Sequence, residues 1–256
     1  MQEKQCKMVK VISQEMLAPD IYSIWLDAGD MAAAAKPGQF VSVYSKDNSR
    51  LLPRPISICE IDRDGGRLRL VYRIVGEGTK EFSSLKAGDA AKVLGPLGNG
   101  YTLKHSTSIL VAGGIGIPPM LQLAKELKGE KTIVLGYRDS RMFLKEDFEG
   151  LGKIVIATED GSVGTKGNVL DAMKAEGVAG DVIYSCGPTP MLKALKNYAE
   201  GEGIEAQISL EEKMACGIGA CLACVCQSTE VDHHSNVHNK RICKDGPVFD
   251  AREVDL

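Results

Sequence analysis

The sequence SILVAGGIGIPPM, residues 108–120, decides the fold of the region around it. Residues 108–112 form a continuous apolar run, as in a strand buried on both faces, and a glycine-rich turn follows at once. Pro118 and Pro119 then open a stretch with helical spacing, a position in which proline is well tolerated. Strand, turn and helix in this order predict the first unit of a doubly wound α/β sheet.

The same alternation continues along the chain. Apolar strands recur between helical stretches, which is typical of a parallel, doubly wound sheet. We therefore predict an α/β nucleotide domain over residues 102–210. After the first strand, the expected strands are 132–135, 154–157, 182–184 and 206–210, and the expected helices include 120–127, 168–175 and 190–200.

The residues before this domain, 1–101, have a different texture. Short runs of alternating apolar and polar residues are separated by turn sequences such as Pro37-Gly38 and Asp64-Gly65-Gly66. Many short strands at such spacing predict a closed antiparallel β-barrel. The expected strands include 9–11, 21–26, 39–44, 67–74 and 91–94.

Composition narrows the class of protein. The 256 residues suffice for two compact domains and an appendage, and the net charge of −3 gives no reason to expect nucleic-acid binding. No apolar run approaches the roughly 20 residues of a membrane span, and the polar N-terminus leads into no secretion signal. We expect a soluble, cytoplasmic protein that binds neither membrane nor nucleic acid.

The cysteines crowd into the last part of the chain, residues 211–256. Cys216, Cys221 and Cys224 are spaced C-x4-C-x2-C, and Cys243 follows, which is the spacing of plant-type 2Fe–2S ligands. Glycines within the loop permit it to wrap around a cluster and to aim N–H groups at its sulfurs. We predict a 2Fe–2S cluster-binding segment with these four thiolates as ligands.

Two alternatives to a cluster are open at this point. A structural zinc site is one, because His233, His234 and His238 lie nearby, and unliganded thiols are the other. Three cysteines in one loop fit a cluster better than the short paired hooks of zinc sites. We expect Cys226 to be a bystander.

A phosphate-binding site is expected on the barrel. Arg54-Pro55-Ile56-Ser57 begins a strand, and Gly78-Thr79 leads into a short helix with Thr79 as a cap. Helix N-termini attract phosphate, and an arginine beside one can clamp a pyrophosphate. The alternative is a surface arginine beside an ordinary turn.

A second phosphate site is expected at the glycine turn that opened this section. Gly114 and Gly116 permit close approach of a pyrophosphate, although Pro119 stands where the usual fingerprint has a third glycine. Cys186-Gly187-Pro188 ends a later strand at the same edge of the sheet, and we interpret Cys186 as lining a nicotinamide site without acting as a nucleophile. A structural turn and a buried structural thiol are the alternatives.

Taken in order, these motifs resemble the ferredoxin–NADP reductase superfamily. With the C-terminal cysteines added, nearly the whole chain resembles the electron-transfer subunits of type B dihydroorotate dehydrogenases, most specifically over residues 214–224. The resemblance implies FAD on the barrel, NAD(H) on the second domain and a 2Fe–2S cluster near the C-terminus. It also implies a heterotetramer with an FMN-containing catalytic subunit that oxidises dihydroorotate to orotate.

The resemblance also assigns residues. It places Arg54 and Thr79 at the FAD phosphates and Ser57 near the isoalloxazine, and it puts a second flavin-contacting strand at Val71-Tyr72-Arg73. Electrons would then pass from the partner's flavin through the cluster and FAD to NAD⁺. The residues leave the choice between NAD and NADP open, because Arg138 favours a 2′-phosphate and Asp139 opposes one.

Two rival functions deserve a test. One is the small subunit of an electron-bifurcating NADH-dependent ferredoxin–NADP oxidoreductase or of a sulfide dehydrogenase, in which an aspartate replaces the first cluster cysteine; here that position is Cys216. The other is a non-catalytic, zinc-stabilised interaction module on a reductase scaffold. Such a module would be colourless, whereas FAD with a 2Fe–2S cluster gives a yellow-brown protein.

Overall fold

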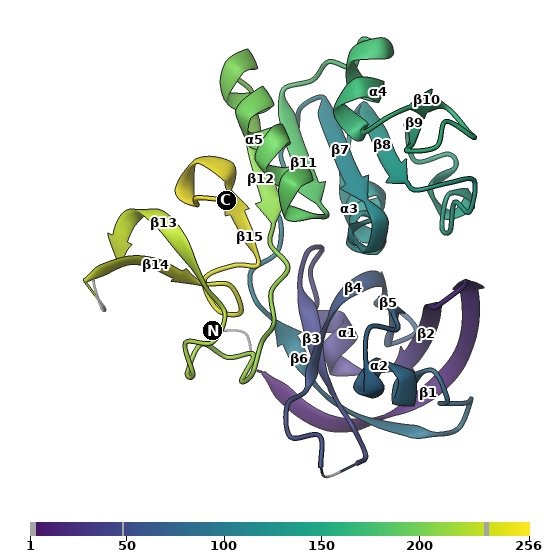
Figure 1. Ribbon diagram of the computed structural model, residues 1–256. Helices are drawn as coiled ribbons and strands as arrows, with labels where there is room; N and C mark the ends of the chain where they lie inside the picture. Colours follow the sequence, from purple (N-terminus) through teal and green to yellow (C-terminus); the bar gives the residue numbers. More distant parts are fainter. Residues whose placement is uncertain (1–3, 48, 233–235) are drawn as a thin grey trace.

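The computed structural model describes residues 4–47, 49–232 and 236–256. The N-terminal part forms a barrel, and a sheet flanked by helices lies above it (Figure 1). The yellow C-terminal segment runs along one side and reaches both parts (Figure 1). Among the described residues, no helix is both long and apolar enough to cross a membrane.

The barrel is closed by six antiparallel strands in the order β1-β2-β5-β4-β3-β6, which confirms the predicted antiparallel barrel. Alternate residues of each strand fill its interior, so that Val41 and Val43 point inward. Phe40 belongs to a different core, outside the barrel. The elements are β1 (Gln5–Ala18), β2 (Ile21–Asp27), α1 (Asp30–Ala34), β3 (Phe40–Tyr44), β4 (Arg54–Asp62), β5 (Arg67–Arg73), α2 (Glu77–Phe82) and β6 (Ala90–Leu97).

Strand β1 is much longer than the run 9–11 that its sequence predicts. Val9 and Val11 are buried, but the outward-facing Met8 and Met16 are 63% and 62% exposed. The alternation that marks a half-buried strand is therefore short. Backbone hydrogen bonds to β2 and β6 extend the strand, and no local sequence pattern predicts this pairing.

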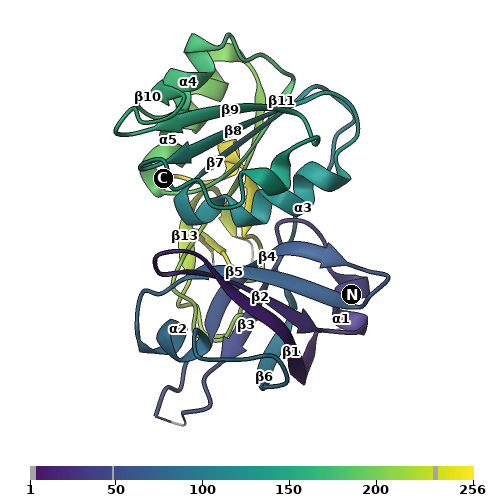
Figure 2. The same cartoon turned by 90° about the vertical axis from the view of Figure 1, so that its right-hand side faces the viewer.

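The second domain is a sheet with helices on both faces. Helix α3 packs on one face with Leu110 and Leu135, while α4 and α5 pack on the other with Val111 and Val134 (Figure 2). The strand order is β10-β9-β8-β7-β11-β12-β15. The elements are β7 (Ser108–Gly113), α3 (Pro118–Glu126), β8 (Lys131–Tyr137), β9 (Lys153–Thr158), β10 (Thr165–Lys166), α4 (Val169–Ala175), β11 (Val182–Cys186), α5 (Thr189–Glu202) and β12 (Glu205–Ser209).

The predicted parallel sheet is confirmed for the strands β7 to β12, and the C-terminal segment adds one antiparallel strand at its edge. Strand β15 (Val248–Asp250) comes from the C-terminal segment and pairs antiparallel with β12. It has only three residues, too few for any periodicity. The rest of the segment holds a hairpin, β13 (Val225–Asp232) with β14 (Val237–Arg241).

Polar contacts join the barrel to the second domain. The Ile61 N–H of β4 donates to Gln122 Oε1 of α3 at 2.7 Å. Arg69 of β5, whose side chain is 8% exposed, donates to Asp147 Oδ1 at 2.5 Å and lies 3.4 Å from a Glu60 carboxylate oxygen. Asp147 follows β8 in the chain, so this cation ties the barrel to a loop of the second domain.

We expect Arg69→Met to lower the free energy of unfolding by about 2–4 kcal/mol, because it leaves the Asp147 carboxylate at the domain junction without its cation, whereas Glu60 keeps Lys125 at 2.5 Å. Urea denaturation followed by circular dichroism measures the change. Arg252→Met is the matched control, since Arg252 is 71% exposed in its pair with Asp250, and it should change stability little. Equal effects of the two substitutions would contradict this account of the junction.

Candidate functional site: a cysteine loop and two ligand sites at the domain junction

The four predicted cluster ligands lie within one small region. Cys224 and Cys243 are buried, Cys216 is half-buried and Cys221 is exposed. Backbone N–H groups of the loop point at the thiols: Ala220 N lies 3.3 Å from Cys216 Sγ, and Gly219 N lies 3.1 Å from Cys243 Sγ. Gly219 has a positive φ of 85°, so the loop curls as the sequence predicts.

The pKa values of two of these thiols shift in opposite directions. Burial alone would raise the pKa of Cys216, but N–H groups of the loop and the Cys221 thiol lower that pKa to about 6. Burial, followed by the neighbouring Cys224, raises the pKa of Cys243 to about 12. Cys216 is therefore ready to ligate as a thiolate, whereas Cys243 needs a cation to draw off its proton.

The thiols meet in two pairs, Cys216 with Cys221 and Cys224 with Cys243. Across the described part of the chain, no three Cys, His, Asp or Glu side chains surround one metal position. Each iron of a two-iron cluster takes two thiolates, so a set of four cysteines that meet in two pairs fits a 2Fe–2S cluster.

The neighbouring Cys226 and His238 make other contacts. Cys226 Sγ lies 3.6 Å from the Lys240 carbonyl oxygen across the hairpin, and His238 Nδ1 lies 3.2 Å from the Ser228 carbonyl oxygen. Both are held by backbone groups of β13 and β14. His233 and His234 lie outside the described residues.

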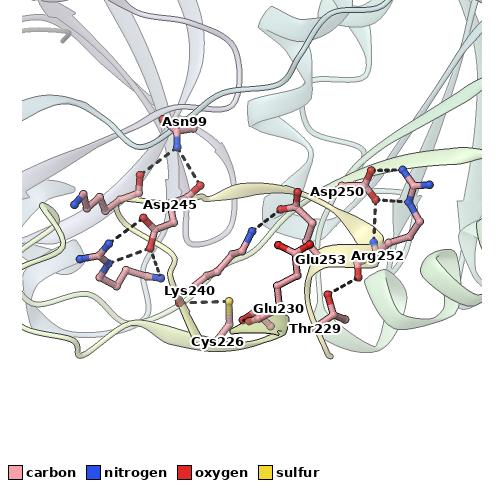
Figure 3. A network of polar contacts seen from close by, with 12 residues as sticks. Asn99, Cys226, Thr229, Glu230, Lys240, Asp245, Asp250, Arg252 and Glu253 are labelled. Carbon is pink, nitrogen blue, oxygen red and sulfur yellow. Dashed lines mark hydrogen bonds and ion pairs between the residues drawn. The ribbon is translucent and has the colours of Figure 1, made fainter. Parts of the chain in front are cut away.

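Asn99, just past β6, ties the cysteine segment to the barrel (Figure 3). Its side-chain amide donates to the carbonyl oxygens of Lys244 and Asp245 at 3.1 and 3.0 Å, and its N–H donates to Gly246 at 2.6 Å. The Asp245 carboxylate in turn accepts from the Arg241 N–H at 2.8 Å. The turn that carries Cys243 is thus fixed from both sides.

The predicted FAD residues gather on β4 and α2. Arg54 begins β4, and a methyl group on Gly78 would come 2.6 Å from Arg54 Nε, so only glycine lets the guanidinium lie against the start of α2. Thr79 Oγ1 accepts from the Val75 and Gly76 N–H groups at 2.9 and 3.3 Å, so its side chain closes the turn before α2. The helix begins earlier than expected, because Gly76 is the N-cap and Gly78 and Thr79 lie within α2. Ser57 pairs with Phe40 across β3 and β4.

β5, the strand expected to make the second set of flavin contacts, divides its residues between two faces. Val71 and Arg73 of β5 lie on the outer side, toward the second domain. Tyr72 points into the barrel, where it is 3% exposed and donates to Gln14 Oε1 at 3.0 Å. The Tyr72 ring therefore lies inside the barrel and not on its outer surface.

The glycine turn lies against the end of β11, as a ligand site at the sheet edge requires. A methyl group on Gly116 would come 2.3 Å from the Cys186 carbonyl oxygen, and one on Gly187 would come 3.2 Å from the Gly113 nitrogen. Pro118 and Pro119 occupy the first turn of α3. Gly114, Gly116, Pro119 and Cys186-Gly187-Pro188 are thus brought together.

Glu211 belongs to the same place, and sequence reasoning missed it. Glu211 Oε1 lies 3.9 Å from Cys186 Sγ, although the residue as a whole is exposed. Desolvation of its carboxylate raises the pKa of Glu211, and the positive charge of Arg73 opposes that rise. Burial raises the pKa of the Cys186 thiol well above its usual value, which suits a packing residue and not a nucleophile. A carboxylate directly after the expected strand 206–210 was the available signal.

Arg138 and Asp139, which bear on the choice between NAD and NADP, follow the end of β8. Asp139 accepts from the Arg141 side chain, with Nε 2.9 Å from Oδ1, and this bond is the main cause that lowers the pKa of Asp139 to about 2. Arg138 acts on Asp139 only more weakly. The carboxylate is thus charged but already paired.

A flavin-type barrel, a dinucleotide-type sheet and a cysteine loop for a cluster define an iron–sulfur flavoprotein reductase of the nicotinamide-linked class. The profile described as the oxidoreductase FAD-binding domain matches residues 8–101, and that of the iron–sulfur cluster binding domain of dihydroorotate dehydrogenase B matches residues 211–255. The chain belongs to the family of dihydroorotate dehydrogenase B (NAD⁺) electron transfer subunits. FAD and an iron–sulfur cluster are its cofactors.

The chain is similar to two electron transfer subunits over nearly its whole length, and two solved structures share its fold. The dihydroorotate dehydrogenase B (NAD⁺) electron transfer subunit of Listeria monocytogenes serotype 4a is 43% identical and that of Lysinibacillus sphaericus 44%, with 97% and 99% of this chain and 98% and 99% of those chains covered. A chain from the structure of an NADH-dependent reduced ferredoxin–NADP oxidoreductase has a TM-score of 0.87 at 30% identity, over 97% of this chain and 90% of that one. The cytochrome b5 reductase domain of Ulva prolifera nitrate reductase, at 20% identity and TM-score 0.66 over 80% of this chain and 97% of that one, shares the fold.

We expect Cys243→Ser to remove most of the acid-labile sulfide from protein prepared without oxygen, because it takes one thiolate from a buried pair. Cys226→Ser is the control on the same segment and should keep a full complement of sulfide, since its thiol lies against the Lys240 carbonyl oxygen across the hairpin. Iron and sulfide analysis measures both. Loss of the cluster in Cys226→Ser, with retention in Cys243→Ser, would reverse the assignment.

We expect Gly116→Ala to raise the KM for NADH at least tenfold while FAD stays bound, because the new methyl group must displace the Cys186–Gly187 backbone. Steady-state kinetics and the flavin absorption spectrum measure the two effects. Gly201→Ala is the control, because a methyl group there, in α5, meets nothing within 4 Å. An unchanged KM for NADH in Gly116→Ala would show that the glycine turn does not belong to the nucleotide site.

Proposed function

We propose that this chain passes electrons from an FMN-containing catalytic subunit, which oxidises dihydroorotate to orotate, to NAD⁺. When bound, the cluster carries electrons one at a time, and FAD collects two and exchanges them with NAD⁺ as a hydride. The protein binds the cofactors, fixes their separation and sets their potentials. The names of the relatives, at 43–44% identity over nearly the whole chain, support this reading.

One observation carries the proposal: the three candidate sites meet. A methyl group on Gly217 of the cysteine loop would come 2.9 Å from Ser42 Oγ, and Ser42 is the pairing partner of Pro55 in the flavin strand. On the other side, Arg73 reaches Gly114 of the nucleotide turn. A cluster, a flavin and a nicotinamide held at these places form one continuous route.

The residue assignments are part of this proposal. Residues 1–101 hold FAD through β4, β5 and α2, residues 102–210 hold NAD(H), and residues 211–256 hold the 2Fe–2S cluster. The FAD set is Arg54, Pro55, Ile56, Ser57, Val71, Tyr72, Arg73, Gly78 and Thr79, with Tyr72 contributing from inside the barrel. The NAD set is Gly114, Gly116, Pro119, Cys186, Gly187 and Pro188, and the cluster ligands are Cys216, Cys221, Cys224 and Cys243.

We propose a heterotetramer of two copies of each subunit in the cytoplasm. Ile218 and Leu222, which lie between the ligand cysteines, are 42% and 57% exposed. Apolar side chains in a cofactor loop gain from being covered, and a cluster whose one face is open accepts electrons readily from a docked protein. This supports a partner on that face.

The rival bifurcating function is supported less well. The solved relative of that kind is 30% identical, against 43–44% for the dihydroorotate dehydrogenase subunits. Position 216 is a cysteine, which also favours the latter.

We expect the isolated chain, loaded with FAD and cluster, to oxidise NADH with ferricyanide as acceptor and to bleach its own cluster. It should not oxidise dihydroorotate, because no group for deprotonating a pyrimidine was found in its sequence. Stopped-flow spectroscopy under argon measures both reactions. The Cys243→Ser variant should keep the ferricyanide reaction and lose the bleaching, and a loaded wild-type chain that reduces no acceptor would refute the proposal.

A further inference from the structure

Ser42 of the barrel is buried without a hydrogen-bond partner. Its side chain is 1% exposed, and its hydroxyl finds no partner among the described residues. Burying an unpaired hydroxyl is unfavourable, so such groups are rare in native proteins and call for an explanation. The residue lies in the middle of β3, where an apolar side chain would fit the strand equally well.

The hydroxyl faces the cysteine segment. Ser42 shares the outer side of β3 with Phe40, whose ring belongs to the core that includes Cys224 and Cys243. Gly217, next to the ligand Cys216, packs directly on the hydroxyl: a methyl group at Gly217 would come 2.9 Å from Ser42 Oγ. Gly217 has a positive φ of 69°, so the loop turns its backbone, and no side chain, toward the barrel at this point.

The strands that pair with β3 show which sites lie next to Ser42. Across one edge, Ser42 pairs with Pro55 of the flavin strand, and across the other it lies opposite Leu94 of β6. It therefore stands between the flavin strand and the loop that carries Cys216. Backbone N–H groups of the cysteine segment itself donate to the thiols.

We propose that Ser42 is a positioning residue for the iron–sulfur cluster, and that its hydroxyl donates a hydrogen bond to a sulfur on the Cys216 side of the bound cluster. The inference rests on the proposed function, because it requires the cluster. A donor at a cluster sulfur stabilises the reduced, more negative state and raises the reduction potential. The barrel that holds the flavin thereby takes part in setting the potential of the neighbouring centre.

We expect Ser42→Ala, purified with FAD and cluster in place, to have an equilibrium constant for one-electron cluster reduction about tenfold lower than that of the wild type. That is a negative shift of about 59 mV for a one-electron couple. A redox titration followed by electron paramagnetic resonance measures the cluster, and the visible spectrum follows FAD in the same sample. The FAD potential should stay unchanged.

A second readout tests the hydrogen bond itself. In the wild type, the reduced cluster should show one exchangeable proton coupling in pulsed electron paramagnetic resonance that disappears in D₂O and is missing from Ser42→Ala. Ser42→Thr keeps a hydroxyl and should restore both the coupling and the potential. Ser108→Ala is the matched control, because that buried hydroxyl already donates to the Ser106 carbonyl oxygen at 3.2 Å, away from the segment.

Three results would overturn the inference: an unchanged cluster potential in Ser42→Ala, a shift of the FAD potential in its place, or an equal shift in Ser108→Ala. Acid-labile sulfide is measured in each sample, so a variant that loses its cluster is recognised, and Ser42→Thr then decides by its own potential. Failure of the proposed function is separate, because it would leave the wild-type chain without a reducible cluster.

Discussion

The sites depend on one packed seam between the barrel, the sheet and the cysteine segment. Phe40 and Leu97 of the barrel, Ile208 of the sheet, and Cys224 with Cys243 share a single core. Protein interiors are close-packed, so none of these parts can shift without moving the others. A segment of about 46 residues is too short to build its own core, and this one uses the core of its neighbours.

The same seam explains why cysteines of one chain behave so differently. Cys186 is enclosed at the end of a sheet strand, and the absence of water raises the pKa of its thiol. Cys216 lies in a loop whose N–H groups converge on its sulfur, and its pKa falls. A cysteine is therefore not a metal ligand by its residue type alone. Backbone N–H groups that point at the sulfur favour the thiolate, which is the form that binds metal.

Much of the architecture could be predicted because local chemistry dictates it. A buried run followed by glycines and prolines can hardly be other than a strand, turn and helix, and β7 and α3 follow residues 108–120 closely. The long β1 and the three-residue β15 were not predicted to their full extent, since both depend on pairing with distant strands. The inward direction of Tyr72 was likewise hidden, because a motif names a residue and not the face it occupies.

By itself, the sequence determined the order of the domains and the spacing of the ligand cysteines, because strand periodicity, glycine turns and C-x4-C-x2-C are local properties. Only the tertiary structure decided how the thiols pair, that Glu211 faces Cys186 and Arg73, and that Ser42 lies under the cysteine loop. These are contacts between segments far apart in the chain. They arise from the packing of the barrel, the sheet and the returning C-terminal segment against one another, and no local pattern encodes them.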